Sequence, residues 1–241
     1  MSRRSKSRKP DRPPALQVEE LSKYYGDVAA LEEVDLEVPV GQSVVLVGHN
    51  GSGKSTLLSM VAGVLEPTSG EVRIHGRPND TMAARAERSW LPDTPVLYDD
   101  LSVREHVEYI NRMHGGQGED EVIDELIVQL GLGEREDQLP SQFSRGLRQK
   151  TAIAVALCRP FSILLVDEPF VGLDAPGRLA FLDLLDEARD NGATIVVATH
   201  DPDVIDRFER GIMLANGEVV HDGDAADLHA LLSPDDRHGG R

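Results

Sequence analysis

The sequence predicts an α/β fold with a mostly parallel core sheet. Short apolar runs of the kind found in buried strands occupy residues 43–47, 162–166 and 194–198. Helical patterns separate these runs, and buried strands that alternate with helices are typical of a parallel sheet covered on both faces. Residues 100–158 differ, because they contain only helical patterns broken by glycine and proline. We therefore expect an α-helical subdomain, at about residues 93–158, inserted into the α/β core.

The remaining elements are placed by periodicity and by turn residues. The dipeptide Asn216-Gly217 lies between apolar residues and is a strong signal for a β-hairpin, with strands at 211–215 and 218–220. Helices are expected at residues 54–62, 103–114, 121–130, 144–158, 177–189 and 225–232.

Composition and charge narrow the function classes. The chain has 241 residues and one cysteine, Cys158, which excludes an internal disulfide framework and a cysteine-rich zinc site and favours a reducing compartment. Residues 1–12 hold six of the 25 basic residues and one of the 42 acidic residues, so the rest of the chain carries a net charge of −22. Such an acidic body should repel nucleic acid, and we expect no nucleic-acid partner. No apolar run approaches the roughly 20 residues that cross a bilayer, so we do not expect the chain to span a membrane by itself.

The two ends of the chain are expected to lie outside the folded domain, which covers residues 15–232. Residues 1–14 combine basic residues with three prolines and lack the apolar segment of a signal peptide, which predicts a disordered basic tail. A weak tether to anionic lipid is a second interpretation of this tail. Residues 233–241 are rich in Asp, His and Gly and predict a frayed tail.

The strongest chemical signal is a glycine-rich run that follows the strand at residues 43–47. Glycines let successive backbone N–H groups turn toward phosphate oxygens, and the next helix directs its positive end at the same anion. Within this run Lys54 supplies a charge to the outer phosphates, and the Ser55 hydroxyl can bind Mg²⁺. The pattern G-x-x-x-x-G-K-[ST] predicts a phosphate-binding loop formed by Gly48, His49, Asn50, Gly51, Ser52, Gly53, Lys54, Ser55 and Thr56.

Three further polar residues follow predicted buried strands. Asp167 and Glu168 come directly after residues 162–166, and His200 closely follows residues 194–198. Ligands of open α/β sheets bind at the carboxyl ends of strands, so these side chains should share an edge of the sheet with the phosphate loop. We assign Asp167 to the metal, Glu168 to general-base catalysis on water, and His200 to a contact with the γ-phosphate.

Together these residues resemble the nucleotide-binding subunit of ATP-binding cassette (ABC) transporters. The motifs occur in the family's order, with Walker A at residues 48–56, Walker B at 164–168, the D-loop at 172–174 and the switch histidine at His200. The resemblance covers nearly the whole chain. It implies the P-loop NTPase fold of ABC ATPases, with an antiparallel β part beside the parallel sheet, and it implies ATP and Mg²⁺ as cofactors.

The resemblance also assigns residues outside the phosphate loop. Tyr25 matches the aromatic position that stacks on adenine. Where the family signature reads LSGGQ, the chain reads Phe143-Ser144-Arg145-Gly146-Leu147, so Ser144 and Gly146 match and Arg145 replaces a glycine. The two matching residues are expected to offer donors to the γ-phosphate bound by a partner subunit.

A second departure from the family pattern lies at the Q-loop. Asp93 follows Trp90-Leu91-Pro92, where the family usually has glutamine. Hard cations prefer oxygen ligands, so Asp93 joins Ser55 and Asp167 as an expected Mg²⁺ ligand, and we expect altered metal dependence or altered coupling to the partner.

The function implied by the resemblance is ATP hydrolysis that powers a separate membrane permease, in the export direction. The chain is expected to act as a homodimer or as a heterodimer with another ABC ATPase. Its expected location is cytoplasmic, peripheral on the inner face of the cell membrane. Two alternatives remain open, namely a soluble non-transport ABC ATPase, for example in iron–sulfur assembly, and a weakly hydrolysing regulatory subunit.

Overall fold

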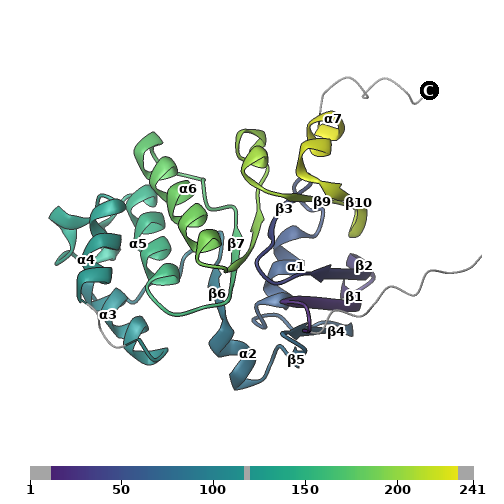
Figure 1. Ribbon diagram of the computed structural model, residues 1–241, viewed down its shortest axis with the longest axis horizontal. Helices are drawn as coiled ribbons and strands as arrows, with labels where there is room; N and C mark the ends of the chain where they lie inside the picture. Colours follow the sequence, from purple (N-terminus) through teal and green to yellow (C-terminus); the bar gives the residue numbers. More distant parts are fainter. Residues whose placement is uncertain (1–11, 117–119, 233–241) are drawn as a thin grey trace, which may run out of the picture.

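The computed structural model describes residues 12–116 and 120–232, and within them the chain forms two β-sheets flanked by helices (Figure 1). The predicted tails at residues 1–14 and 233–241 lie almost entirely outside the described residues. The larger sheet has the strand order β10-β9-β3-β8-β7-β6, and the smaller sheet has the order β2-β1-β4-β5. This arrangement confirms the α/β fold with a mostly parallel core sheet and an antiparallel β part.

The six-stranded sheet is parallel except at one edge. Strand β3 pairs in parallel with β8 and β9, and β7 pairs in parallel with β8 and β6, whereas β10 runs antiparallel to β9. Every residue of β3, β7 and β8 is buried, as strands covered on both faces require. The strands span Ser43–Val47 (β3), Arg88–Leu91 (β6), Ile163–Asp167 (β7), Thr194–Ala198 (β8), Arg210–Ala215 (β9) and Glu218–Asp224 (β10).

Two strands of this sheet differ from the sequence-based prediction. Strand β6 was not predicted, because its residues, Arg-Ser-Trp-Leu, do not form an apolar run. Strand β7 lies one residue later than predicted, so Asp167 is its last residue. The predicted hairpin is confirmed, and Asn216 and Gly217 form its turn with φ values of 51° and 85°.

The four-stranded sheet is antiparallel throughout. Strands β1 and β2 form a long hairpin that reverses at Gly26, whose φ of 62° suits a residue without a side chain. The strands span Leu16–Tyr25 (β1), Val28–Val38 (β2), Ser69–Ile74 (β4) and Arg77–Pro78 (β5).

The predicted helices lie within one or two residues of their ranges, with one exception, and a short helix at Met82–Glu87, α2, was not predicted. The range 225–232 divides into a 3₁₀ turn at Ala225–Asp227 and a short helix, α7. The start of helix α3 was predictable because Ser102 and Glu105 form a reciprocal capping box, which is a sequence signal for a helix N-terminus. The helices span Lys54–Val61 (α1), Met82–Glu87 (α2), Val103–Met113 (α3), Asp120–Gln129 (α4), Arg145–Leu157 (α5), Ala175–Asp190 (α6) and Leu228–Leu232 (α7).

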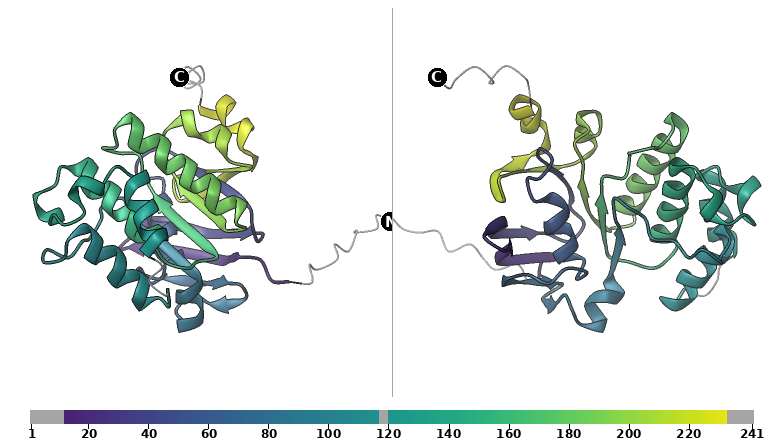
Figure 2. Two further views of the ribbon diagram at one scale, coloured as in Figure 1. Left: turned by 60° about the vertical axis from the view of Figure 1, so that its left-hand side comes forward. Right: turned by 180° about the vertical axis from the view of Figure 1, so that it is seen from behind.

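The large sheet separates two apolar cores. On β7, Ile163 and Leu165 face the core shared with α1 and the antiparallel sheet, whereas Leu164 and Val166 face the core shared with α3, α4, α5 and α6. Figures 1 and 2 show these helices on one side of the sheet and α1 with the antiparallel sheet on the other. Helices α3, α4 and α5 fall within the range predicted for the helical subdomain, residues 93–158, whereas α6 lies outside it; the subdomain and its boundaries stay a prediction.

No helix in the described ranges has both the length and the apolar character needed to cross a membrane.

Candidate functional site

The glycine-rich loop joins β3 to α1, as predicted. Gly48 has a φ of 154°, and a Cβ there would lie 2.3 Å from the Leu214 carbonyl oxygen. Gly53 precedes α1 with a φ of 108°, and its Cβ would lie 2.7 Å from the Ala30 carbonyl oxygen. Only glycine fits these two positions, which let the loop backbone pass close to neighbouring segments and wrap tightly, as a phosphate-binding loop does.

Lys54 begins α1 and is buried, with 6% of its side chain exposed. Its Nζ donates to the carbonyl oxygen of Gly48 at 2.9 Å and lies 3.7 Å from Glu168 Oε1. The ammonium group is thus held inside the loop that it would use to bind phosphate.

Asp167 ends β7 and is almost fully buried. The Ser55 hydroxyl donates to its carboxylate, but Oδ1 has no hydrogen-bond partner in the described chain. Burial raises the pKa of Asp167, and the charges of Glu168 and Asp93 raise this pKa further. A buried carboxylate oxygen without a partner, beside a hydroxyl, fits a hard cation such as Mg²⁺.

No group of three His, Cys, Asp or Glu residues arranged to hold a metal occurs in residues 12–116 and 120–232. A cation bound at Ser55 and Asp167 would therefore complete its coordination with water and phosphate oxygens, as Mg²⁺ does at nucleotide sites. The residues present fit such a cation.

Glu168 and His200 lie beside each other at the ends of β7 and β8. Glu168 Oε2 accepts a hydrogen bond from His200 Nδ1 at 2.8 Å and a longer one from the His200 backbone N–H at 3.4 Å. Glu168 itself has a φ of 45°, an uncommon value for a residue with a side chain, and its N–H donates to Ala198 O at 2.9 Å. The backbone therefore holds this carboxylate at the sheet edge.

A cavity of about 460 Å³ lies over the loop. Lys54 is the one basic side chain among the described residues that line it. The lining residues are Ala30, Asn50, Gly51, Ser52, Gly53, Lys54, Ser55, Thr56, Asp93 and Glu168.

Other predicted residues lie outside this lining. The ring of His49 bonds to the Asn50 carbonyl oxygen at 2.8 Å. Tyr25 is 55% exposed, and Lys23 Nζ lies 5.4 Å from the centre of its ring. Adenine stacking on Tyr25 stays a prediction, and the ring is free to make such a contact.

Ser144 and Gly146 lie at the start of α5, and neither lines the cavity of their own chain. The Ser144 hydroxyl caps the helix by accepting from Leu147 N–H at 3.4 Å. A Cβ on Gly146 would lie 2.4 Å from the Gly172 carbonyl oxygen. The glycine thus has a packing role that the sequence did not reveal, because it brings α5 close to the loop after Glu168.

Further contacts fasten α5 to that loop. Gln149 Nε2 donates to Pro169 O at 3.2 Å, and Lys150 Nζ lies 2.8 Å from Asp174 Oδ1. The hydrogen bond from Lys150 lowers the pKa of Asp174. These contacts connect the start of α5 directly to the segment that follows Glu168.

Two features of the site were missed from the sequence. Ala30 reaches the cavity from β2 of the antiparallel sheet. Asp93 Oδ1 lies 3.9 Å from a guanidinium nitrogen of Arg145. Neither contact has a local sequence signal, because both join distant segments.

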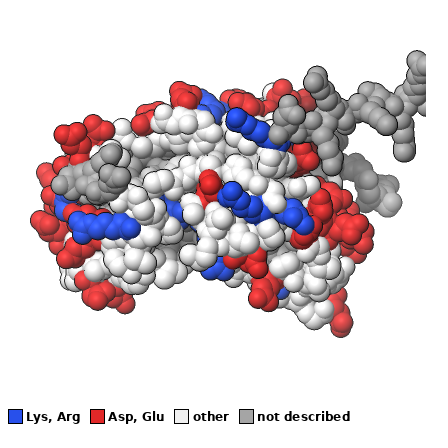
Figure 3. All heavy atoms as spheres, turned by 60° about the horizontal axis from the view of Figure 1, so that its bottom comes forward, with Lys and Arg blue, Asp and Glu red and all other residues white. Residues whose placement is uncertain are grey.

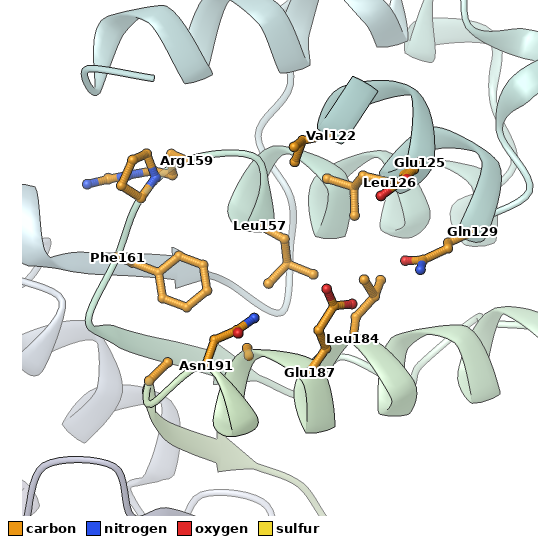
Figure 4. A pocket seen from close by; sticks show the side chains of 13 residues that line it. Val122, Glu125, Leu126, Gln129, Leu157, Arg159, Phe161, Leu184, Glu187 and Asn191 are labelled. Carbon is orange, nitrogen blue, oxygen red and sulfur yellow. The ribbon is translucent and has the colours of Figure 1, made fainter. Parts of the chain in front are cut away.

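A second cavity, of about 280 Å³, lies between α4, α6 and the end of α5 (Figure 4). Its wall combines apolar side chains, such as Leu157 and Phe161, with polar ones, such as Glu125 and Glu187. It shares no residue with the cavity over the loop. It is therefore not part of the candidate phosphate site.

Comparison with known proteins matches residues 31–171 to the family described as "ABC transporter". The chain is 31% identical over 218 residues to the ABC-type transporter ATP-binding protein EcsA of Bacillus subtilis, covering 88% of each chain. It is 31% identical over 210 residues to the SkfA peptide export ATP-binding protein SkfE of the same organism, covering 86% of this chain and 88% of the relative.

A solved structure shows the same fold. It is the dimeric, post-hydrolysis state of the ATP-binding cassette MJ0796 bound to ADP and phosphate, with a TM-score of 0.79 and 28% identity. The match covers 87% of this chain and 98% of that one.

Proposed function

This chain belongs to the ABC transporter family as an ATP-binding subunit with ATPase activity, and from that premise we propose that it drives a separate membrane permease that exports its cargo. The export direction is supported by the name of SkfE, a peptide export ATP-binding protein. The proposed location is the cytoplasmic face of the membrane, where such a permease would present its docking segments.

The phosphate loop is the proposed binding site for the triphosphate of ATP. Residues 48–56 supply backbone N–H groups, and Lys54 exchanges its contact with the Gly48 carbonyl oxygen for phosphate oxygens. Tyr25 is the proposed platform for adenine.

Ser55, Asp167 and Asp93 are the proposed ligands of Mg²⁺. When bound, this ion would neutralise part of the phosphate charge and help to place the outer phosphate. The unpartnered Oδ1 of Asp167 supports this assignment.

The observation that best supports hydrolysis is the position of Glu168 between Lys54 and His200. Its Oε1 lies 3.7 Å from Lys54 Nζ, and its Oε2 accepts from His200 Nδ1 at 2.8 Å. A carboxylate held at the edge of a phosphate cavity can orient water and accept its proton for attack on the γ-phosphate. His200 holds Glu168 in place and can stabilise charge on the γ-phosphate.

The active unit is proposed to be a dimer, either of two identical chains or with a second ABC ATPase. Ser144 and Gly146 lie outside the cavity of their own chain, so a second chain would have to bring these residues to the phosphate. The dimeric relative supports this arrangement.

A groove of about 280 Å³ between α1, α2, β6, α3 and the end of α5 is the proposed docking site for the permease. Arg85, Arg88 and Arg159 line it, and none of them forms an ion pair with a carboxylate in the described ranges. Burial, then the charges of Arg85 and Arg159, lower the pKa of Arg88 to about 10. A groove with uncompensated positive charge suits an acidic segment of the partner.

The surface around α2 supports the same assignment. Figure 3 shows the molecule from this side, with acidic side chains gathered mainly at the margins and uncharged surface over much of the middle. Trp90 lines the groove, and Asp93, three residues later, lines the phosphate cavity. The end of β6 therefore joins the docking groove to the nucleotide site.

Co-purification tests the proposal. The tagged full chain would be expressed in its native host and recovered in mild detergent, and Mg²⁺-dependent ATPase activity would be measured with and without Glu168→Gln. We expect a polytopic membrane protein in the eluate and loss of activity in the variant. Glu134→Gln, an exposed substitution on the 3₁₀ turn at Gly133–Arg135, serves as the control.

Each other outcome would contradict one part of the proposed function. Recovery of soluble partners alone would favour a non-transport ABC ATPase, for example in iron–sulfur assembly. Very weak hydrolysis by the unsubstituted chain would favour a regulatory subunit. Undiminished hydrolysis by Glu168→Gln would remove Glu168 from the role of base.

A further inference from the structure

Asp93, which lines the nucleotide cavity, forms an ion pair with Arg145. Asp93 follows β6, and Arg145 is the first residue of α5. The carboxylate oxygen and the guanidinium nitrogen lie 3.9 Å apart, and their side chains are 47% and 67% exposed. Asp93 stands where the family usually has glutamine, and Arg145 replaces a glycine of the family signature.

The charges around the cavity show why this pair matters. Three carboxylates lie in or beside the cavity, on Asp93, Asp167 and Glu168, whereas Lys54 is the one cation lining it among the described residues. This balance is negative before a nucleotide arrives, and ATP adds further negative charge. Arg145 is the cation that offsets Asp93.

Arg145 is well placed to act on Asp93 because α5 is anchored. A Cβ on Gly172 would lie 3.2 Å from Arg145 Cγ, so the stem of Arg145 passes close to the backbone of that loop. Gly146 and Gln149 also contact residues of the 169–174 segment. The first turn of α5, which carries Arg145, is therefore anchored to the 169–174 segment, and the guanidinium group projects from this anchored turn.

We propose that Arg145 is a positioning residue for nucleotide binding. Its pairing with Asp93 neutralises that carboxylate and holds it at the cavity wall, so the phosphate loop can accept an anionic nucleotide. The inference rests on the proposed function, since it takes ATP as the ligand of this cavity. Asp93 and Arg145 each replace an uncharged residue of the family pattern. In this proposal the two replacements act together as a pair of opposite charges.

An exposed ion pair by itself contributes little to stability, so the proposal predicts an effect on ligand affinity rather than on folding. The affinity effect should shrink when salt screens the charges, because the Debye length falls from about 10 Å at 0.1 M to about 3 Å at 1 M.

The test is a double-mutant cycle on the full chain with Asp93→Gln, Arg145→Gln and both together. Binding of a fluorescent ATP analogue is titrated with and without Mg²⁺, at low and high salt. Without Mg²⁺, where the proposed contact of Asp93 with the metal plays no part, we expect Arg145→Gln to weaken binding about fivefold at low salt, and the double variant to bind within about twofold of the unsubstituted chain. Arg112→Gln, which removes an exposed arginine paired with Glu108 on α3, should leave binding unchanged.

A charge swap, Asp93→Arg with Arg145→Asp, adds a second criterion. Recovery of affinity in the swapped chain supports the pair, as does an Arg145→Gln defect that disappears at high salt. Additive effects in the cycle overturn the proposal, as does an Arg145→Gln defect that is unchanged by salt. If the unsubstituted chain binds no nucleotide, the proposed function itself fails. Thermal unfolding of each variant identifies any that has lost its fold, and the charge-swapped chain then provides the decisive comparison.

Discussion

His200 Nδ1 lies 2.8 Å from Glu168 Oε2, although the two residues are 32 positions apart in the sequence. The contact exists because β7 and β8 are parallel neighbours whose carboxyl ends meet at one edge of the sheet. His200 is 62% exposed and Glu168 is 14% exposed. The carboxylate is thus held from the solvent side by a histidine that can also reach a ligand.

Substitution His200→Ala should lower the rate of ATP hydrolysis by about 10²- to 10³-fold while nucleotide affinity changes little. The substitution removes the donor that orients Glu168 and the group expected to stabilise charge on the γ-phosphate. Single-turnover hydrolysis and analogue binding would be measured in parallel. His229→Ala, far along the chain on α7, is the matched control, and an equal loss in both variants would contradict the assignment.

Substitution Gly53→Ala should destabilise the fold by about 1–3 kcal/mol more than Gly51→Ala. Both glycines have positive φ, so the backbone strain is similar in the two variants. They differ in space, because a Cβ at Gly53 would meet Ala30 O and Leu31 Cδ2 at 2.7 Å, whereas nothing lies within 4 Å at Gly51. Urea unfolding of both variants measures the difference in unfolding free energy. Equal losses of stability would show that the loop shifts to make room for a Cβ at Gly53.

The sequence predicted the part of the site that depends on strand order. The apolar runs at β3, β7 and β8 are buried on both faces, and the polar residues after them therefore meet at one edge. The loop between β3 and α1 was also predictable from the sequence. Close backbone contacts require its glycines, and glycines at this spacing form a strong local pattern.

Other features have no local pattern. Strand β6 is a short edge strand that contains Arg88 and Trp90, and pairing with β7 rather than composition makes it a strand. Helix α6 starts two residues before the predicted range because Asp174 caps it by accepting from Gly177 N–H at 3.0 Å. The contact of Asp93 with Arg145 depends on the packing of α5 against the core, which periodicity does not encode.

Substitution Asp167→Asn should stabilise the nucleotide-free chain, raising Tm by a few degrees at pH 7.5. The pKa of Asp167 is raised above 3.8 by burial, so burying the ionised carboxylate opposes folding. The group favours folding when protonated, below pH 3.8, and this contribution is lost as pH rises through the raised pKa. The same variant should lose the extra stability that Mg²⁺ gives with an ATP analogue, because a cation ligand is removed.

Thermal unfolding with and without Mg²⁺ measures both effects. Asp137→Asn, an exposed substitution, controls for the loss of one charge. A lower Tm without nucleotide, or unchanged stabilisation by Mg²⁺, would contradict the role given to Asp167.

Cys158 should resist thiol reagents in the folded chain. Burial raises its pKa from 9.0 to about 12, so the thiolate population near pH 8 falls by about 10³-fold relative to the unfolded chain. Because the thiol is favoured in the fold, its contribution to stability is present below pH 9.0 and is lost as pH rises toward about 12. Labelling with a chromogenic disulfide measures this directly, since the chain has one cysteine. Rapid labelling without denaturant would contradict the burial of Cys158.

Substitution Arg85→Glu should abolish recovery of the membrane partner while nucleotide binding persists. Arg85 is exposed on α2 and lines the docking groove, so reversing its charge leaves the core intact. The groove also contains Arg88 and Arg159, and Arg159 Nε is buried without a hydrogen-bond partner in the described chain. The substitution places a carboxylate opposite the acidic segment of the partner. Repulsion then replaces attraction, which lowers the affinity across a partly buried interface.

The matched control is Arg112→Glu, which makes the same charge change on α3 outside the groove. Co-purification from the native host would be compared for both variants at equal expression, together with binding of an ATP analogue. If Arg112→Glu loses the partner equally, net charge rather than the groove controls the association. If Arg85→Glu retains the partner fully, the permease docks elsewhere. Because Trp90 lines the groove three residues before Asp93, partner-stimulated hydrolysis should fall together with partner recovery, whereas basal hydrolysis should remain.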